Sequence, residues 1–144
     1  SPYKLASELQ DICSKHAPII RDKANLAAGL EKVLELKKRA QSVGTGGPIG
    51  RAFNPGWHTA RDLGNMLVNA EALFRSALER KESRGAHARS DYPNLDPKFA
   101  TVNLVVHRGE HGMAVKAVEV PPVPPELLAV INRSYEKFTP EETE

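Results

Sequence analysis

Three segments of the chain share an apolar repeat with helical spacing, and this repeat constrains the fold most strongly. They cover about residues 3–15, 23–42 and 55–81, which predicts an antiparallel three-helix bundle over about residues 3–81. The expected core positions are Leu5, Leu9, Ile12 and Cys13; Leu26, Leu30, Val33 and Leu34, with Leu36 at the edge; and Leu63, Leu67, Ala70, Leu73, Phe74, Ala77 and Leu78.

Local signals set the helix boundaries. Pro18 disfavours helix in the residue before it, so residues 17–21 should form a short extended link. Asp22 is the expected N-cap of the second helix. Asn54 caps the third, with Pro55 in the first turn, where a missing N–H costs nothing.

Two further segments have simple interpretations. Lys37, Lys38 and Arg39 end the second helix, where cations favour the helix dipole, and a solvated helix end is expected rather than a binding patch. Residues 43–50 contain four glycines and a proline but lack the Gly-Lys-Ser/Thr ending of a phosphate-binding loop, so a connector is expected.

The second half of the chain has a different character. Residues 101–107 and 113–120 favour strands, and the intervening residues 109–112 predict a hairpin, about residues 99–120, with a loop of several residues. A proline-rich stretch, a short helix over 126–135 and a mobile acidic tail over 136–144 should follow. The fold class is therefore mainly α: a three-helix bundle followed by a β-hairpin and a short C-terminal segment, with residues 1–135 as one domain.

Composition excludes several classes of function. The 144 residues carry a formal charge of +2, which is too small to indicate nucleic-acid binding. No apolar run approaches the ~20 residues of a membrane span, so direct membrane insertion is not expected. Cys13 is the only cysteine, which excludes an intramolecular disulfide or a cysteine-based metal cluster. The missing initiator methionine suggests an excised or processed piece.

Residues 82–93 concentrate polar and charged side chains after the third helix. Ser83 with His87 as its base could act as a nucleophile, but no Gly-x-Ser-x-Gly elbow surrounds the serine. A structural role is favoured, in which arginine forks and carboxylates hold the helix end in a fixed contact, internally or across a domain boundary. The expected anchoring residues are Glu82, Ser83, Arg84, Gly85, His87, Arg89, Asp91 and Tyr92.

Metal and dinucleotide sites have weak support. His107 and His111 have the spacing of two zinc ligands on a helix, but the residues between them indicate a turn. No Gly-x-Gly-x-x-Gly follows a strand, so the sequence predicts no dinucleotide-binding element in this chain. No cofactor-binding residue, metal ligand or catalytic residue is therefore assigned from these patterns.

The stretch from Glu82 to Arg89, followed by Asp91-Tyr92-Pro93, resembles the C-terminal region of the succinate dehydrogenase and fumarate reductase flavoprotein family. The preceding residues 63–72 and 76–80 are similar to the long helix before that motif. Residues 1–10 and 18–21 resemble the opening helix and link of the family. The resemblance covers roughly residues 1–130.

This resemblance implies a function for a parent subunit, an FAD-dependent oxidoreductase acting on CH–CH groups. Succinate would lose a hydride to FAD, and electrons would pass through an iron–sulfur subunit to quinone. The flavin and substrate residues of the family precede the helical domain, so this chain alone should be inactive, bind no FAD and pack on the FAD domain. The subunit would be cytoplasmic and peripheral on the inner face of a bacterial plasma membrane.

Two alternatives remain open. L-aspartate oxidase shares this architecture and a similar Glu-Ser-Arg-Gly motif. The chain could also be a stand-alone helical interaction module that presents its hairpin and proline-rich stretch to a partner.

Overall fold

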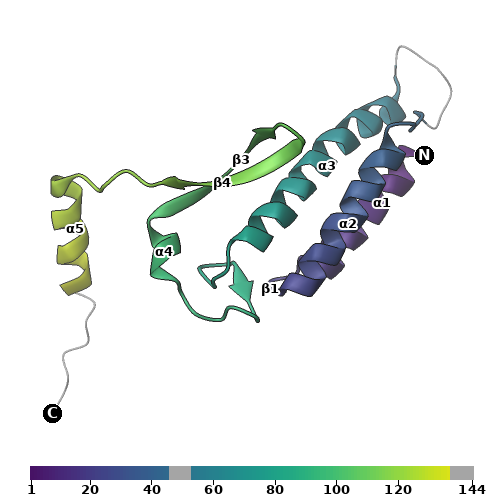
Figure 1. Ribbon diagram of the computed structural model, residues 1–144. Helices are drawn as coiled ribbons and strands as arrows, with labels where there is room; N and C mark the ends of the chain where they lie inside the picture. Colours follow the sequence, from purple (N-terminus) through teal and green to yellow (C-terminus); the bar gives the residue numbers. More distant parts are fainter. Residues whose placement is uncertain (46–52, 137–144) are drawn as a thin grey trace.

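The computed structural model describes residues 1–45 and 53–136. Three long helices, α1 (Pro2–His16), α2 (Lys23–Ala40) and α3 (Pro55–Glu79), pack against one another as a bundle, and each runs antiparallel to the next (Figure 1). The hairpin of β3 (Val102–Gly109) and β4 (Gly112–Glu119) lies against α3. The remaining elements are β1 (Ile20–Arg21), β2 (Ala88–Arg89), α4 (Pro97–Ala100) and α5 (Pro125–Glu136). The predicted mainly α fold of bundle, hairpin and short C-terminal helix is confirmed.

The apolar faces of the three long helices meet in one core. Its most deeply buried members are Leu26, Val33, Leu63 and Phe74, none of which is exposed to solvent. Gly29 allows a close contact, since a Cβ there would lie 2.3 Å from the Phe74 ring. Burial of this apolar surface supplies the main stabilisation of the bundle.

The predicted helix caps are present. The Asp22 carboxylate accepts a hydrogen bond from the Asn25 N–H at 2.9 Å, and the Asn54 side chain accepts one from the Trp57 N–H at 3.0 Å. Each satisfies a backbone donor that the first helical turn leaves free. The extended link before Asp22 is also confirmed, as β1.

Two core predictions were wrong in detail. Leu36 is buried at the centre of the stripe rather than at its edge, because it continues the spacing of Leu26, Gly29 and Val33. Leu73 is 40% exposed, because it flanks the stripe that Phe74 occupies.

The hairpin turn is tighter than expected. Strand pairing continues to Gly109 opposite Gly112, which leaves only Glu110 and His111 as the turn. Gly112 has a φ of +120°, which an L-residue with a side chain rarely adopts. The two glycines therefore extend the strands into the segment that was predicted as a loop.

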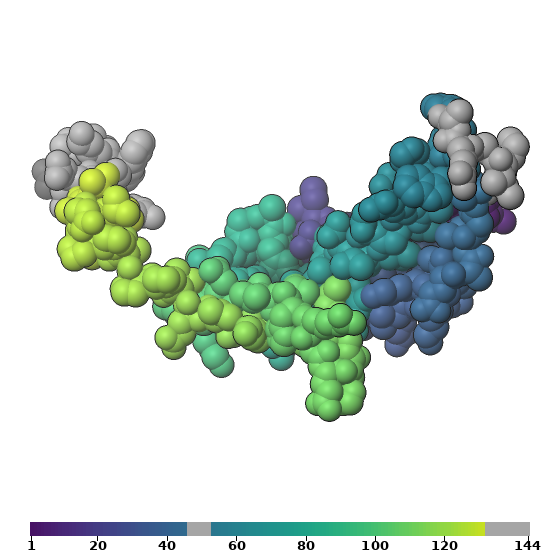
Figure 2. Space-filling view, turned by 90° about the horizontal axis from the view of Figure 1, so that it is seen from above, coloured from purple at the N-terminus to yellow at the C-terminus, as the bar shows by residue number. Residues whose placement is uncertain are grey.

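The last helix stands apart from the bundle. Figure 2 shows α5 at one end of the molecule, joined to the hairpin by a narrow extended stretch over residues 120–124. Leu127 and Leu128 on this helix are 54% and 47% exposed. The predicted acidic tail beyond residue 136, and residues 46–50 of the predicted connector, lie outside the described residues.

Candidate functional site

Residues 82–93 fold back onto the start of α2. Ile20 and Arg21 pair in parallel with Ala88 and Arg89, and the Ser90 N–H donates to the Arg21 carbonyl at 2.9 Å. The paired residues are 68 positions apart in sequence. The loop therefore joins the C-terminal end of α3 to the N-terminal end of α2.

A tight turn positions the loop. The backbones of Arg84 and His87 exchange two hydrogen bonds, of 2.8 and 3.0 Å. Gly85 lies between them with a φ of +56°, in the left-handed region that favours glycine. This is the backbone turn that the sequence predicted at Gly85.

Arg89 is the buried centre of the loop, with 2% of its surface exposed. Its guanidinium holds both carboxylate oxygens of Asp91 at 2.7 Å and donates to the Ala77 carbonyl in the last turn of α3 at 2.6 Å. Asp91 also accepts from the Lys23 N–H, the first residue of α2. Arg89 and Asp91 together connect the end of one helix to the start of another, and the Tyr92 ring packs 5.0 Å from the Arg89 guanidinium.

Glu82 is a second buried centre. Its carboxylate accepts hydrogen bonds from Arg80, from Arg84 at 2.9 and 3.1 Å, and from the Asp96 N–H at 2.9 Å. The hydrogen bonds from Arg84, with those from Asp96 and Arg80, lower the pKa of Glu82 to about 2. Those from Arg89, with the Lys23 N–H, lower the pKa of Asp91 to about 2. Both carboxylates are therefore ionised at neutral pH.

Ser83 and His87 do not form a catalytic pair. The Ser83 hydroxyl accepts from the Arg89 N–H at 2.7 Å and donates to the Tyr92 carbonyl at 2.9 Å. The His87 ring contacts the Arg80 carbonyl through Nε2 and Arg21 through Nδ1, each at 3.1 Å. A carbonyl can only accept and a guanidinium can only donate, so His87 is neutral with its proton on Nε2.

The environment of His87 supports this protonation state. Burial, reinforced by the nearby charges of Arg21, Arg89 and Arg80, lowers its pKa. All eight predicted anchoring residues lie in this loop, where Glu82, Ser83, Arg84, His87, Arg89 and Asp91 make side-chain hydrogen bonds within the chain. Their role in anchoring a second domain stays a prediction.

A buried carboxylate within the bundle was not predicted from the sequence. Glu71 on α3 is 2% exposed and is held by Lys37 of α2 at 2.7 Å and by Arg75 at 2.8 Å. Burial alone would raise its pKa, but the two hydrogen bonds outweigh that effect and lower it. Lys37 was predicted to end the helix in solvent, and its ion pair instead links α2 to α3.

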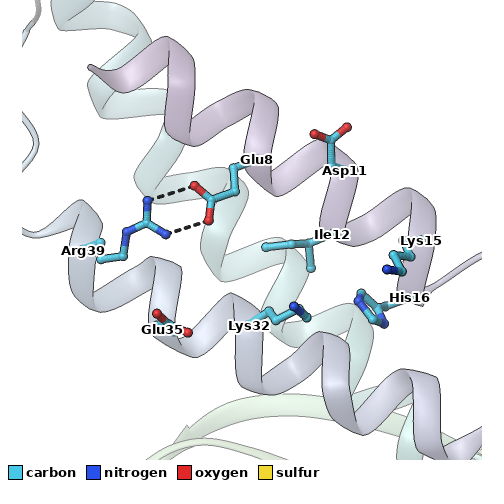
Figure 3. A pocket seen from close by; sticks show the side chains of 8 residues that line it. All are labelled: Glu8, Asp11, Ile12, Lys15, His16, Lys32, Glu35 and Arg39. Carbon is cyan, nitrogen blue, oxygen red and sulfur yellow. Dashed lines mark hydrogen bonds and ion pairs between the residues drawn. The ribbon is translucent and has the colours of Figure 1, made fainter.

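A cavity of about 260 Å³ lies between α1 and α2. Figure 3 shows the bidentate pair of Arg39 with Glu8 at one end and His16 beside Lys15 at the other. Three acidic and three basic side chains line it, so their charges cancel and select no ion of either sign. His16 is 6% exposed and its Nδ1 atom has no hydrogen-bond partner.

The described residues show neither a metal-ligand cluster nor a dinucleotide-binding turn. No group of three or more His, Cys, Asp or Glu side chains there could hold a metal ion. His107 lies on β3 and His111 in the turn. The one parallel strand pair is two residues long and lacks the glycine-rich turn into a helix that binds a dinucleotide. No helix over the described ranges is long and apolar enough to span a bilayer.

Known proteins are similar to this chain in both sequence and fold. A family described as "Fumarate reductase flavoprotein C-term" matches residues 6–138. The chain belongs to this family. It is 33% identical to a fumarate reductase flavoprotein subunit of Mycobacterium tuberculosis over 75% of the chain, and 30% identical to a succinate dehydrogenase flavoprotein subunit of Coxiella burnetii over 85%.

Solved structures agree with this assignment. The Sdh1 complex of Mycobacterium smegmatis, in its apo form, contains a chain that is 40% identical and superposes with a TM-score of 0.81 over 98% of this chain. The FrdA chain of Escherichia coli quinol fumarate reductase superposes with a TM-score of 0.77 over 87%, at 25% identity. These matches cover 25% and 22% of the solved chains, and the chain spans about a fifth of the length of the curated relatives.

The family assignment predicted from residues 82–93 is confirmed. The relatives include both succinate dehydrogenase and fumarate reductase subunits, and they are parts of FAD-dependent flavoprotein oxidoreductases. The chain therefore belongs to a C-terminal domain of such flavoproteins.

Proposed function

We propose that this chain is the structural C-terminal domain of a flavoprotein subunit that interconverts succinate and fumarate. The observation that carries the proposal is the family match over residues 6–138, which includes the bundle, the 82–93 loop and the hairpin. In this proposal the reaction requires the rest of the subunit, which supplies the flavin site.

In the proposed reaction, the redox chemistry takes place outside this chain. FAD, held by the preceding domain, supplies the redox chemistry, and electrons leave through an iron–sulfur subunit toward quinone. The subunit lies on the cytoplasmic side of the plasma membrane, attached through its partner subunits. This chain supplies no catalytic residue.

The role of the chain is to keep the bundle and the hairpin in a fixed arrangement. Arg89 and Asp91 fix the end of α3 against the start of α2. Arg80 reaches from the end of α3 to the carbonyl of Val102 at the start of the hairpin, at 3.4 Å. Because Glu82 of the loop holds Arg80, the loop helps to fix the hairpin against the bundle, and we propose that this combined surface packs on the FAD domain.

The test is to isolate the native polypeptide that carries this sequence. The proposal predicts a polypeptide several times longer than 144 residues, with a flavin absorbance that succinate bleaches and fumarate restores. The 144-residue chain alone should be colourless and inactive. A flavin that responds to L-aspartate instead would identify the L-aspartate oxidase alternative.

One observation favours a second candidate, the stand-alone interaction module. Leu127, Leu128 and Ile131 expose apolar surface on α5. A native polypeptide of 144 residues that binds a partner protein and no flavin would support this candidate over the first.

A further inference from the structure

Two adjoining hollows lie between the C-terminal half of α3 and the hairpin. Their volumes are about 460 and 310 Å³, and they share Arg80, His87 and Asn103 as lining residues. The larger is completed mainly by Arg21, Leu73 and Ser76, and the smaller by Arg84, Phe99 and Val120. We call the two together the hairpin groove.

The charged side chains that line the groove are all cationic. They are Arg21, Arg80 and Arg84. Arg80 and Arg84 share one carboxylate, Glu82, whose side chain is fully buried beneath them. Among the described residues, no carboxylate lies within ion-pair distance of Arg21. The groove therefore presents more positive than negative charge.

The Arg21 side chain is held in position without a counter-ion. Its Nε atom donates to the Pro18 carbonyl at 2.8 Å, and Nη1 donates to His87 Nδ1 at 3.1 Å. Because both partners are neutral, they orient the guanidinium without cancelling its charge. Such a pre-oriented fork suits a carboxylate, which can accept from the remaining N–H groups.

The shape of the groove favours a polypeptide over a small molecule. A small-ligand site encloses most of its ligand's surface, whereas this groove is open and has exposed apolar residues on its rim. Leu73 is 40% exposed and Val120 is 42% exposed. A polypeptide segment with a carboxylate beside apolar side chains could pair with Arg21 and cover the apolar rim at the same time.

We infer that the hairpin groove is the docking site for an acidic segment of the FAD domain, with an aspartate or glutamate paired to Arg21. This inference rests on the proposed function and adds the face through which the domain packs. The matched region makes up only 18% of one curated relative and 25% of one solved chain, so a parent subunit of similar length has ample chain to supply the segment.

The test is amide hydrogen exchange of the full-length subunit and of the 144-residue chain. Docking should slow exchange by at least about tenfold at groove amides in α3 and β3 of the full-length subunit, because a bound segment shields them. Amides beside the Glu8–Arg39 pair, on the α1–α2 face, serve as the internal reference. Equal exchange at the groove in both proteins would overturn the inference.

Three variants of the full-length subunit separate docking from folding. Arg21→Gln should remove most of the groove protection, whereas Arg21→Lys, which keeps the charge, should retain much of it. Arg39→Gln removes an arginine from the α1–α2 face and should leave the groove protected. Unchanged protection in Arg21→Gln would contradict the assigned pair.

The outcomes distinguish this inference from the proposed function. A full-length subunit without flavin would refute the function, whereas a flavin-loaded subunit with an unprotected groove would refute only the docking site. Succinate added to the 144-residue chain is the small-carboxylate probe. Saturable shifts of the Arg21 and His87 resonances would show a small-molecule site and overturn the docking of a segment.

Discussion

Replacing Arg89 with methionine should destabilise the chain more than replacing any exposed arginine. Methionine fills a similar volume but makes none of the four hydrogen bonds that the guanidinium donates to Asp91, Ala77 and Arg80. Removing one partner of a buried ion pair costs about 3–5 kcal/mol. Asp91 keeps 30% of its side chain in solvent, so water recovers part of the loss and the lower end, about 3 kcal/mol, applies.

The assay is urea unfolding of the 144-residue chain at pH 7, followed by circular dichroism at the helical minimum. Arg39→Met is the matched control, because Arg39 makes an equally complete bidentate pair with Glu8 on the exposed face. Exposed pairs contribute little, so the control should unfold close to the wild type. Equal midpoints for the two variants would refute the assignment of Arg89 as the central contact.

A double-mutant cycle measures the coupling between Arg89 and Asp91. Asp91→Asn keeps the size of the side chain but removes its charge and replaces one acceptor oxygen with an amide donor. It leaves the buried Arg89 guanidinium without its counter-ion, so a loss comparable to that of Arg89→Met is expected. In the Arg89→Met/Asp91→Asn variant both charges are removed, so no unpaired charge remains in the site. The two single losses should therefore not add, and simple additivity would show that the pair is not coupled.

Three further predictions concern protonation and packing. Because the pKa of Glu82 is depressed, its contribution to the free energy of unfolding is present above pH 4.5 and is lost as the pH falls toward 2. Glu82→Gln should therefore make stability depend less on pH in this range, and an unchanged pH profile contradicts this. The ¹⁵N spectrum of His87 at pH 7 should show a neutral ring protonated on Nε2, and an imidazolium or an Nδ1 proton would contradict the Arg21 contact. Gly29→Ala should lower the thermal midpoint, because its Cβ would overlap the Phe74 ring and overpacking costs about 1–3 kcal/mol, whereas Gly64→Ala, with open space, should not.

The sequence was sufficient to predict features that depend on local spacing. The helical repeat identified α1, α2 and α3, and short-range preferences identified the caps at Asp22 and Asn54. Two runs of β-prone residues identified the hairpin, but the predicted turn was longer than the turn in the structure. A count of residues between strands does not reveal that pairing can continue to the two flanking glycines.

Features that depend on long-range contacts were not predictable. The pairing of β1 with β2 involves two residues on each side, which is too short to leave a periodic signal. Glu71 lies on the buried face of α3, and its ion pairs with Lys37 of α2 and with Arg75 compensate its burial. The grouping of residues 82–93 was predicted from composition, but the role of Arg21 as the partner of His87 required the structure.

The central claim is that the 82–93 loop holds this domain in the shape that the FAD domain requires. Flavin retention by the full-length subunit with Arg84→Ala and His87→Ala tests it most directly, measured as the flavin-to-protein absorbance ratio after gel filtration. We predict a clear loss of flavin relative to the wild type and to an Arg39→Ala control. A double variant that keeps its full flavin content and its thermal stability would contradict the claim.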